Sequence, residues 1–210
     1  TPVDACLGDL MKLEASTADY LQQSVPGFDM EAPHYWANNV LGDGVTAADL
    51  TVSEPALIGW LHTLEAISQL CMASARYRAA ANYARRVLKA EGYPTRAAGT
   101  VLLALARLED QDGFFALAHQ LEEQIGADAL ENSPWYLLAR TILLFKTNKM
   151  RPAARALREF ANRCEGGAFF LLNPVYQTPY LPCRPEPRDP WDLSHQAVWE
   201  ADGIISDTPD

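Results

Sequence analysis

The side chains that can do chemistry in this chain do not have the spacing of an active site. Its four histidines are His34, His62, His119 and His195. No two of them stand four residues apart, and there is no His-Glu-x-x-His motif, so a zinc site on one helix is not indicated. One grouping near the C-terminus has the residue types of metal ligands: Asp189, Asp192, His195 and Glu200. Solvated acids at a helix N-terminus explain most of this grouping without a metal.

Nucleophilic catalysis is not indicated either. The chain has no Gly-x-Ser-x-Gly, Gly-x-Gly-x-x-Gly or Gly-x-x-x-x-Gly-Lys motif. A Cys–His dyad stays open, because such partners meet in space rather than in sequence. The four cysteines are Cys6, Cys71, Cys164 and Cys183. Two disulfides with three connectivities are possible, but Cys71 lies on an apolar helical stripe, which favours free thiols and a cytoplasmic protein. We therefore expect a non-enzymatic protein without catalytic residues, metal or cofactor.

Composition and charge are those of a globular protein with an acidic surface. The 210 residues are 49% hydrophobic and 21% charged, and no apolar run approaches the ~18 residues that span a bilayer. The first residues lack the basic-then-apolar layout of a secretion signal, which also predicts the cytoplasm. The net charge of −10 is divided into −8 over residues 1–57, +3 over 58–165 and −5 over 166–210. This balance argues against nucleic acid and anionic membranes as partners.

Hydrophobic periodicity predicts an all-α chain. Apolar residues recur at helical spacing, and no segment shows sustained alternation with a period of two. The predicted helices cover residues 3–23, 33–41, 55–75, 77–90, 95–108, 114–125, 134–146, 152–163 and, in a shorter form, 189–202. Seven prolines over residues 173–210 favour extended backbone in the tail. Six aromatic residues after residue 166 indicate that this tail is ordered and packed on the helices.

One spacing pattern recurs along the helices. It has a large residue, then a large-small pair, then another large residue in Trp135-x2-Leu138-Ala139-x2-Ile142. The same spacing occurs 71 residues upstream in Leu64-x2-Ile67-Ser68-x2-Cys71. A weaker copy between them is Thr100-x2-Leu103-Ala104-x2-Arg107. Self-similarity at about 35 residues is typical of helical hairpins that stack into a solenoid, and solenoids usually bind rather than catalyse.

These residues resemble the tetratricopeptide repeat family, whose unit pairs two antiparallel helices. The unit over residues 61–94 matches best, since the pattern continues on its second helix with Tyr77, Ala80 and Tyr83. The unit over 133–166 matches on its first helix. In the middle unit Arg107 takes the position of an aromatic residue, so that unit departs from the family pattern.

The resemblance also implies an organisation for the chain. Residues 53–166 would form three hairpins stacked as a short right-handed solenoid, and residues 1–52 would supply N-terminal capping helices. Residues 167–210 would be a proline-rich tail that packs on the solenoid and ends in a short helix. A non-repeat bundle of equally apolar helices shares part of the pattern and is the alternative fold.

In this family the first helix of each pair lines a concave groove that binds a protein or peptide segment. The resemblance therefore implies a non-enzymatic interaction scaffold, with the tail as a structural cap or a lid on the groove. The partner-binding positions carried over are His62, Glu65, Gln69, Met72, Tyr136, Arg140 and Leu143. Glu65 and Gln69 stand where the chaperone-binding branch needs a cationic and an amide residue, which argues against chaperone-tail recognition. The alternative function is a small-molecule or catalytic pocket walled by Trp36, Trp60 and Trp135.

Overall fold

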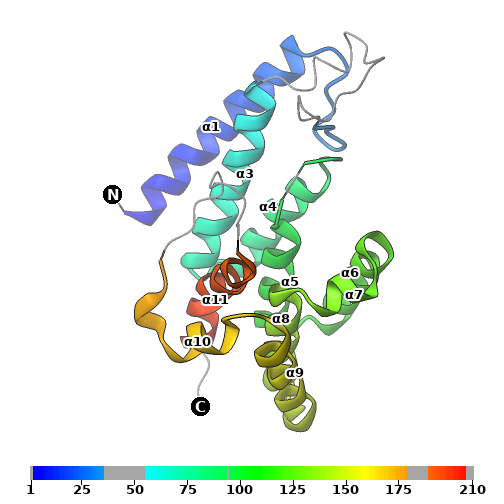
Figure 1. Ribbon diagram of the computed structural model, residues 1–210. Coiled ribbons are helices and arrows are strands. Elements are labelled where there is room, and N and C mark those ends of the chain that lie inside the picture. Colours follow the sequence, from blue (N-terminus) through cyan, green and yellow to red (C-terminus); the bar gives the residue numbers. More distant parts are fainter. Residues whose placement is uncertain (1, 36–54, 94, 179–188, 207–210) are drawn as a thin grey trace.

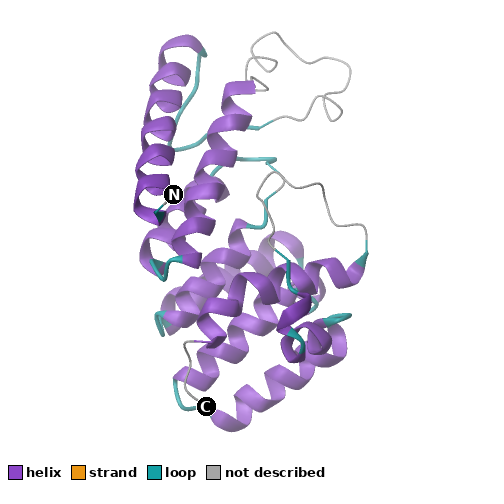
Figure 2. Cartoon of the chain, turned by 90° about the vertical axis from the view of Figure 1, so that its left-hand side faces the viewer, coloured by secondary structure: helices purple, strands orange, loops and turns teal. Residues whose placement is uncertain are grey.

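The chain is all-α in the parts that the structure describes. The computed structural model describes residues 2–35, 55–93, 95–178 and 189–206 (Figure 1). These residues form ten α-helices and one short 3-10 helix, and they contain no strand (Figure 2). The helices are α1 (Val3–Ser24), α3 (Pro55–Ala73), α4 (Tyr77–Leu88), α5 (Ala97–Arg107), α6 (Gln111–Ile125), α7 (Ala127–Glu131), α8 (Pro134–Lys146), α9 (Met150–Arg163), α10 (Gly167–Leu172), η1 (Pro174–Tyr176) and α11 (Pro190–Ser206). None of the helices in these described ranges is long and apolar enough to cross a membrane.

Most of the predicted helices are confirmed, and side-chain caps mark the starts of α6 and α8. α8 has the predicted bounds, and the Ser133 hydroxyl accepts a hydrogen bond from the Tyr136 amide (3.4 Å) at its start. α6 begins earlier than predicted. The Asp110 carboxylate accepts a hydrogen bond from the Gly113 amide (2.9 Å), and this N-cap allows the helix to start at Gln111.

Three segments differ from the sequence prediction. Residues 33–35 are not helical, because the Tyr35 amide donates to the Glu91 carbonyl (2.9 Å) and the segment lies along the end of α4. The rest of that predicted helix lies outside the described residues. α7 has no counterpart in the prediction. The tail begins with a helix, α10, that was not predicted, and α11 continues past the predicted end.

The three helix pairs α3–α4, α5–α6 and α8–α9 close with the same turn. Ala75, Glu109 and Asn148 each have a φ of 59°, the left-handed conformation that commonly follows a helix. In the first turn the Arg76 amide donates to the Cys71 carbonyl (2.8 Å), and equivalent bonds of 3.0 and 2.8 Å close the other two. The three pairs are therefore hairpins of one design, with α7 inserted between the second and the third.

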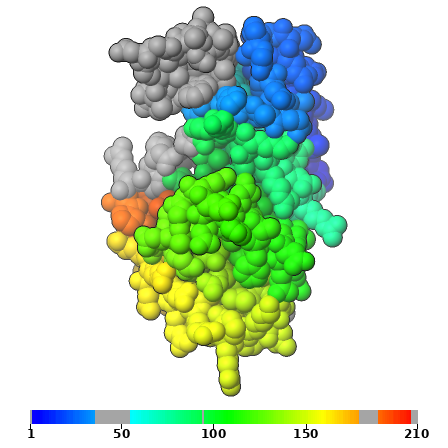
Figure 3. All heavy atoms as spheres, turned by 90° about the vertical axis from the view of Figure 1, so that its right-hand side faces the viewer, coloured from blue at the N-terminus to red at the C-terminus, as the bar shows by residue number. Residues whose placement is uncertain are grey.

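The helices pack as a continuous series with one interruption. α1 packs on α3, α3 on α4, α4 on α5, α5 directly on α8, and α8 on α9 (Figure 1). α6 lies against α5 and α7, and this green part of the chain forms the middle of the face seen in the space-filling view (Figure 3). One core runs through the series and includes Trp60, Leu64, Leu103 and Leu143, none of which is exposed. The first helices of the three hairpins, α3, α5 and α8, consequently adjoin one another in order.

α11 lies across these three first helices. It contacts α8, α3 and α5, and α10 packs against it as well (Figure 1). Its inner face carries Ala197, Val198, Ala201 and Ile204, each at most 1% exposed. Alanines on this face let the helix axes approach closely. A segment at the C-terminal end of the chain thus covers the adjoining first helices of all three hairpins.

Candidate functional site

A buried carboxylate on α11 is the polar centre of this arrangement. Glu200 accepts hydrogen bonds from the Trp135 indole (Nε1 to Oε2, 2.9 Å) and from the Gln69 amide (Nε2 to Oε1, 3.1 Å). The Thr100 hydroxyl is the third donor. Gln69 belongs to α3, Thr100 to α5 and Trp135 to α8, so each hairpin supplies one donor from its first helix. The three hydrogen bonds hold one carboxylate of the C-terminal helix at the junction of the three hairpins.

Gly99 allows the Trp135 indole to reach this position. A Cβ atom at Gly99 would lie 2.3 Å from Cγ of Trp135, closer than carbon atoms approach in folded proteins. The absence of a side chain there lets the indole lie directly against the α5 backbone. On the same ring, the Arg96 guanidinium stands 5.9 Å from the centroid in a cation–π contact. Gly99 of α5 and Arg96, the residue just before α5, therefore orient the indole of Trp135.

The environment of Glu200 has two opposing effects on its protonation. Burial raises the pKa of Glu200 above its ordinary value of 4.5, because the charged form loses its hydration. The hydrogen bonds from Thr100, Trp135 and Gln69 favour the charged form and lower the pKa in part. The pKa stays raised. Docking of α11 is therefore coupled to the protonation state of this carboxylate.

A second carboxylate, that of Glu65, lies on α3 one helical turn before Gln69. Glu65 accepts hydrogen bonds from the Tyr93 hydroxyl (2.8 Å) and the Thr95 hydroxyl (2.6 Å). Burial raises the pKa of Glu65, and the two hydroxyl donors lower it in part. The His62 ring lies 6.2 Å from the Tyr93 ring, centroid to centroid. Glu65 thereby ties α3 to the connection between α4 and α5.

The predicted binding residues of α3 thus have different surroundings. Gln69 contacts α11 through Glu200 and also donates to the Thr100 hydroxyl (3.3 Å). His62 and Glu65 are partly buried beside Tyr93. Met72 is buried in the core at 5% exposure. Among these four predicted residues, Gln69 is the one that the structure brings to the carboxylate of α11.

The predicted binding residues of α8 take no part in the hydrogen bonds of Glu200. Tyr136 is buried and stacks on Phe114 of α6, with ring centroids 6.0 Å apart and planes at 19°. Leu143 is fully buried in the core. Arg140 is partly exposed, and its guanidinium lies 5.9 Å from the Tyr136 ring centroid. These three residues lie away from the Glu200 hydrogen bonds.

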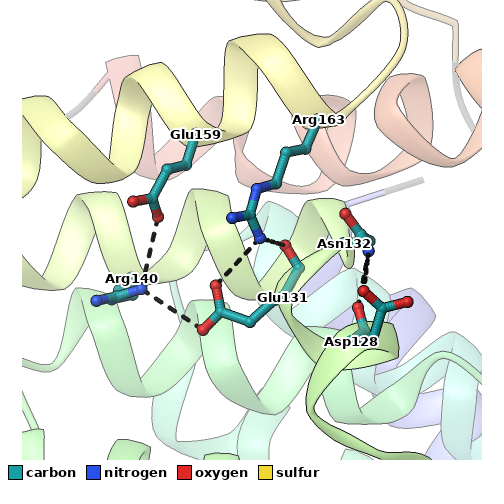
Figure 4. Close-up of polar contacts among 6 residues, drawn as sticks. All are labelled: Asp128, Glu131, Asn132, Arg140, Glu159 and Arg163. Carbon is teal, nitrogen blue, oxygen red and sulfur yellow. Dashed lines mark hydrogen bonds and ion pairs between the residues drawn. The ribbon is translucent and has the colours of Figure 1, made fainter.

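Arg140 belongs to a network of surface charges that links α7, α8 and α9 (Figure 4). It pairs with Glu131 (3.8 Å) and Glu159 (3.7 Å). Arg163 pairs with the same Glu131 (3.5 Å) and also donates to its backbone carbonyl (3.2 Å). All four side chains are between 33% and 44% exposed, so each pair is worth about 0–1 kcal/mol. The network fastens the inserted helix α7 to the third hairpin.

Two tryptophans of the alternative pocket, Trp60 and Trp135, donate hydrogen bonds to acidic side chains. The Trp60 indole donates to Glu14 (2.8 Å), and Arg86 pairs with the same carboxylate oxygen (2.6 Å). Trp135 donates to the carboxylate of α11, as described above. Trp135 also lines a mostly apolar hollow of about 300 Å³ beside α5 and α7. Trp36 lies outside the described residues.

The grouping of metal-ligand residue types near the C-terminus is separated in space. Glu200 points into the hairpin junction, whereas the His195 ring stacks on Phe170 at 4.6 Å between centroids. His195 Nε2 accepts a hydrogen bond from the Thr178 amide (3.1 Å). Across the described ranges, no three His, Cys, Asp or Glu side chains are placed to hold a metal ion.

The role of Glu200 did not emerge from the sequence, although a local signal exists. Glu200 stands three residues after Ala197 and four before Ile204, which places an acid on the apolar stripe of its helix. A charged residue on such a stripe indicates a buried partner. Its donors cannot be identified from this signal, because they lie 65, 100 and 131 residues away in the chain.

Comparison with known proteins finds no family, no curated protein and no solved structure that matches this chain. The described helices define a class, an all-α protein built on three hairpins with a C-terminal helix across them.

Proposed function

We propose that this chain is a non-enzymatic scaffold with a tetratricopeptide-like, right-handed arrangement of hairpins, whose groove binds a helical segment of a partner protein. The groove is the surface of α3, α5 and α8, and in the chain alone its occupant is α11. One observation carries the proposal: Glu200 receives one hydrogen bond from the first helix of each hairpin. The expected absence of a metal, a cofactor and catalytic residues belongs to the same proposal.

The residues of α11 indicate what a partner must present. Its contact face combines one acid with small and branched apolar side chains, among them Ala197, Ala201 and Ile204. Helices commonly bind grooves through such residues at intervals of three and four. The expected partner is therefore an amphipathic helix with a glutamate or aspartate between small apolar residues, which would displace α11 as a lid.

The predicted binding residues take graded roles in this proposal. Gln69 is the direct donor to the partner's acid. His62 and Glu65 are partly buried beside it on α3 and would contact the side of a bound helix. Met72, Tyr136 and Leu143 would support the groove from the core, and Arg140 would fasten its third hairpin. Free thiols at Cys6, Cys71 and Cys164 support the expectation of a reducing, cytoplasmic setting.

The test supplies α11 as a separate peptide to a chain that lacks it. A chain that ends at residue 188 is mixed with a synthetic peptide of residues 189–206, and binding is measured by calorimetry. We expect saturable binding that restores helical signal and thermal stability. A Glu200→Ala peptide should bind at least tenfold more weakly, whereas an Asp202→Asn peptide, altered at an exposed position, should bind like the original.

Two results would overturn the proposal. The shortened chain could remain unfolded in the presence of saturating peptide, which would make α11 an inseparable part of the core. The Glu200→Ala peptide could bind as tightly as the original, which would remove the three donors from recognition. If binding is confirmed, the peptide serves as a competitor that releases proteins captured by the shortened chain.

A further inference from the structure

A second surface, outside the groove, lies where α10, η1 and α11 meet. An open pocket of about 430 Å³ forms there. Its lining consists of Phe169, Phe170, Tyr176, Thr178, Trp191, Asp192 and His195. Five of these seven side chains are aromatic, if the imidazole is counted. Neither the proposed groove nor the hairpin core accounts for such a concentration of rings at the surface.

The rings are arranged as a floor with two walls. Phe170 is 7% exposed and forms the floor. His195 stacks on Phe170 with ring centroids 4.6 Å apart, and the Trp191 ring centroid lies 6.0 Å from that of Phe170. On the other side Phe169 meets Phe170 edge-on at 5.3 Å, and Tyr176 lies 5.4 Å from Phe169. One wall therefore comes from α11 and the other from α10 and η1.

The walls remain open to solvent although their floor is buried. Phe169, Tyr176 and Trp191 are 49%, 60% and 40% exposed. The turn before α10 holds the walls in place, because Gly166 adopts a φ of 73° and a Cβ atom there would lie 3.1 Å from Trp191. The Thr178 amide fixes the His195 ring through Nε2, so this nitrogen carries a lone pair instead of a proton. The aromatic faces are thus held in position around the pocket.

The charge of this region decides which ligand the rings suit. The described lining contains one carboxylate, Asp192, and neither lysine nor arginine. Residues 166–210 carry a net charge of −5 within a chain of −10. An anionic ligand such as a nucleotide would meet repulsion here. Aromatic faces carry negative electrostatic potential and attract cations, most of all those that shed water easily.

We propose that this pocket binds an organic cation of the alkylated ammonium class, with its methyl groups against Phe169, Tyr176 and Trp191. An alkylated ammonium combines apolar methyl groups with a diffuse positive charge, and both are stabilised by aromatic faces. Such a group occurs on free small molecules of the choline type and on trimethylated lysine side chains of proteins. The shared chemistry is the trimethylammonium head.

The test uses the full chain and ligands that differ only in charge. Tetramethylammonium and choline are titrated by calorimetry and ligand-observed NMR at constant ionic strength, alongside 3,3-dimethylbutan-1-ol, the uncharged isostere of choline. We expect saturable binding of both cations and at least tenfold weaker binding of the alcohol. The variants Trp191→Ala and Tyr176→Ala should weaken cation binding at least tenfold. Tyr20→Ala removes an exposed ring on α1 and should leave it unchanged.

The outcomes distinguish charge recognition from apolar contact. Equal binding of the alcohol and choline would overturn the proposal, since the pocket would then be merely apolar. Failure of both cations to bind, or unchanged binding by the Tyr176→Ala variant, would also overturn it. Tyr176 is mostly exposed, so its loss tests the pocket without unfolding the chain. A peptide with trimethyllysine that binds more tightly than choline would assign the head to a protein partner, and the reverse order would assign it to a small molecule.

Discussion

Replacing Glu200 by alanine tests whether its hydrogen bonds hold α11 in place. The substitution removes the acceptor of three donors. The Gln69 amide retains the Thr100 oxygen as a partner at 3.3 Å, so two donors, the indole N–H of Trp135 and the hydroxyl of Thr100, lose theirs. A buried polar group without a partner costs about 1–3 kcal/mol, so the two together cost roughly 2–6 kcal/mol. Removal of a poorly hydrated carboxylate offsets part of this cost, which leaves an expected loss of about 2–4 kcal/mol in the free energy of unfolding.

The pH dependence has a defined sign. Burial raises the pKa of Glu200 above 4.5, so the folded chain holds this proton more tightly than the unfolded chain does. The resulting stabilisation is fully present below pH 4.5 and is lost as the pH rises through the raised pKa. A Glu200→Gln variant cannot titrate at this position. The stability of the original chain relative to this variant should therefore fall as pH rises, by at most about 1.4 kcal/mol per pH unit within the window.

Urea unfolding, followed by circular dichroism between pH 4 and 8, measures both effects. Hydrogen exchange of the α11 amides, compared with those of α8, locates them. We expect the alanine variant to exchange faster in α11 first, and the exposed Asp202→Asn variant to match the original chain. A change of less than about 0.5 kcal/mol for Glu200→Ala, the usual range for surface substitutions, would refute the role given to these hydrogen bonds. A constant difference between the original chain and the Gln variant across pH would refute the titration.

Three further outcomes follow from local geometry. Gly99→Ala should destabilise the chain by about 1–3 kcal/mol in thermal unfolding, because the new methyl group would lie 2.3 Å from an indole carbon. The control Gly59→Ala, where a Cβ atom meets nothing within 4 Å, should be neutral or stabilising in the same assay. Glu14→Gln should cost about 2 kcal/mol in urea unfolding, since the carboxylate is 12% exposed and accepts from both an indole and an arginine. Burial raises the pKa of Cys164 to about 11, so alkylation at pH 8, mapped by mass spectrometry, should leave this thiol unmodified until urea unfolds the chain.

Helices whose signals are local could be predicted from the sequence. Ser133 and Pro134 define the start of α8 by capping and by proline's fixed φ, and both act within one turn. The helix α10 was not predicted, and it forms where the residues after Gly166 pack on α9 and α11. Tertiary contacts decided that segment, and no local pattern encodes them.

The candidate site was only partly predictable for the same reason. Gln69 could be proposed as a binding residue because its position on the first helix follows from the repeat spacing. Tyr136 was also predicted to be a binding residue, but in the structure its ring stacks on Phe114 of α6. The insertion of α7 then places Glu131 next to Arg140. The surroundings of Tyr136 and Arg140 therefore depend on the middle hairpin and the helix after it. Arg107 indicated that the middle unit departs from the repeat pattern, but it did not predict the geometry.

The use of a buried acid in the groove bears on how a partner would be selected. The acid itself adds little net affinity, because burying a carboxylate costs hydration that its hydrogen bonds repay only in part. What the carboxylate adds is position: donors from α3, α5 and α8 meet at one point, so a bound helix satisfies them in a single register and rotation. A helix that lacks the acid, or carries it one turn away, leaves buried donors without partners and is rejected by that cost. The proposed groove would therefore discriminate among amphipathic helices by the placement of one acid, and α11 meets this requirement within the chain itself.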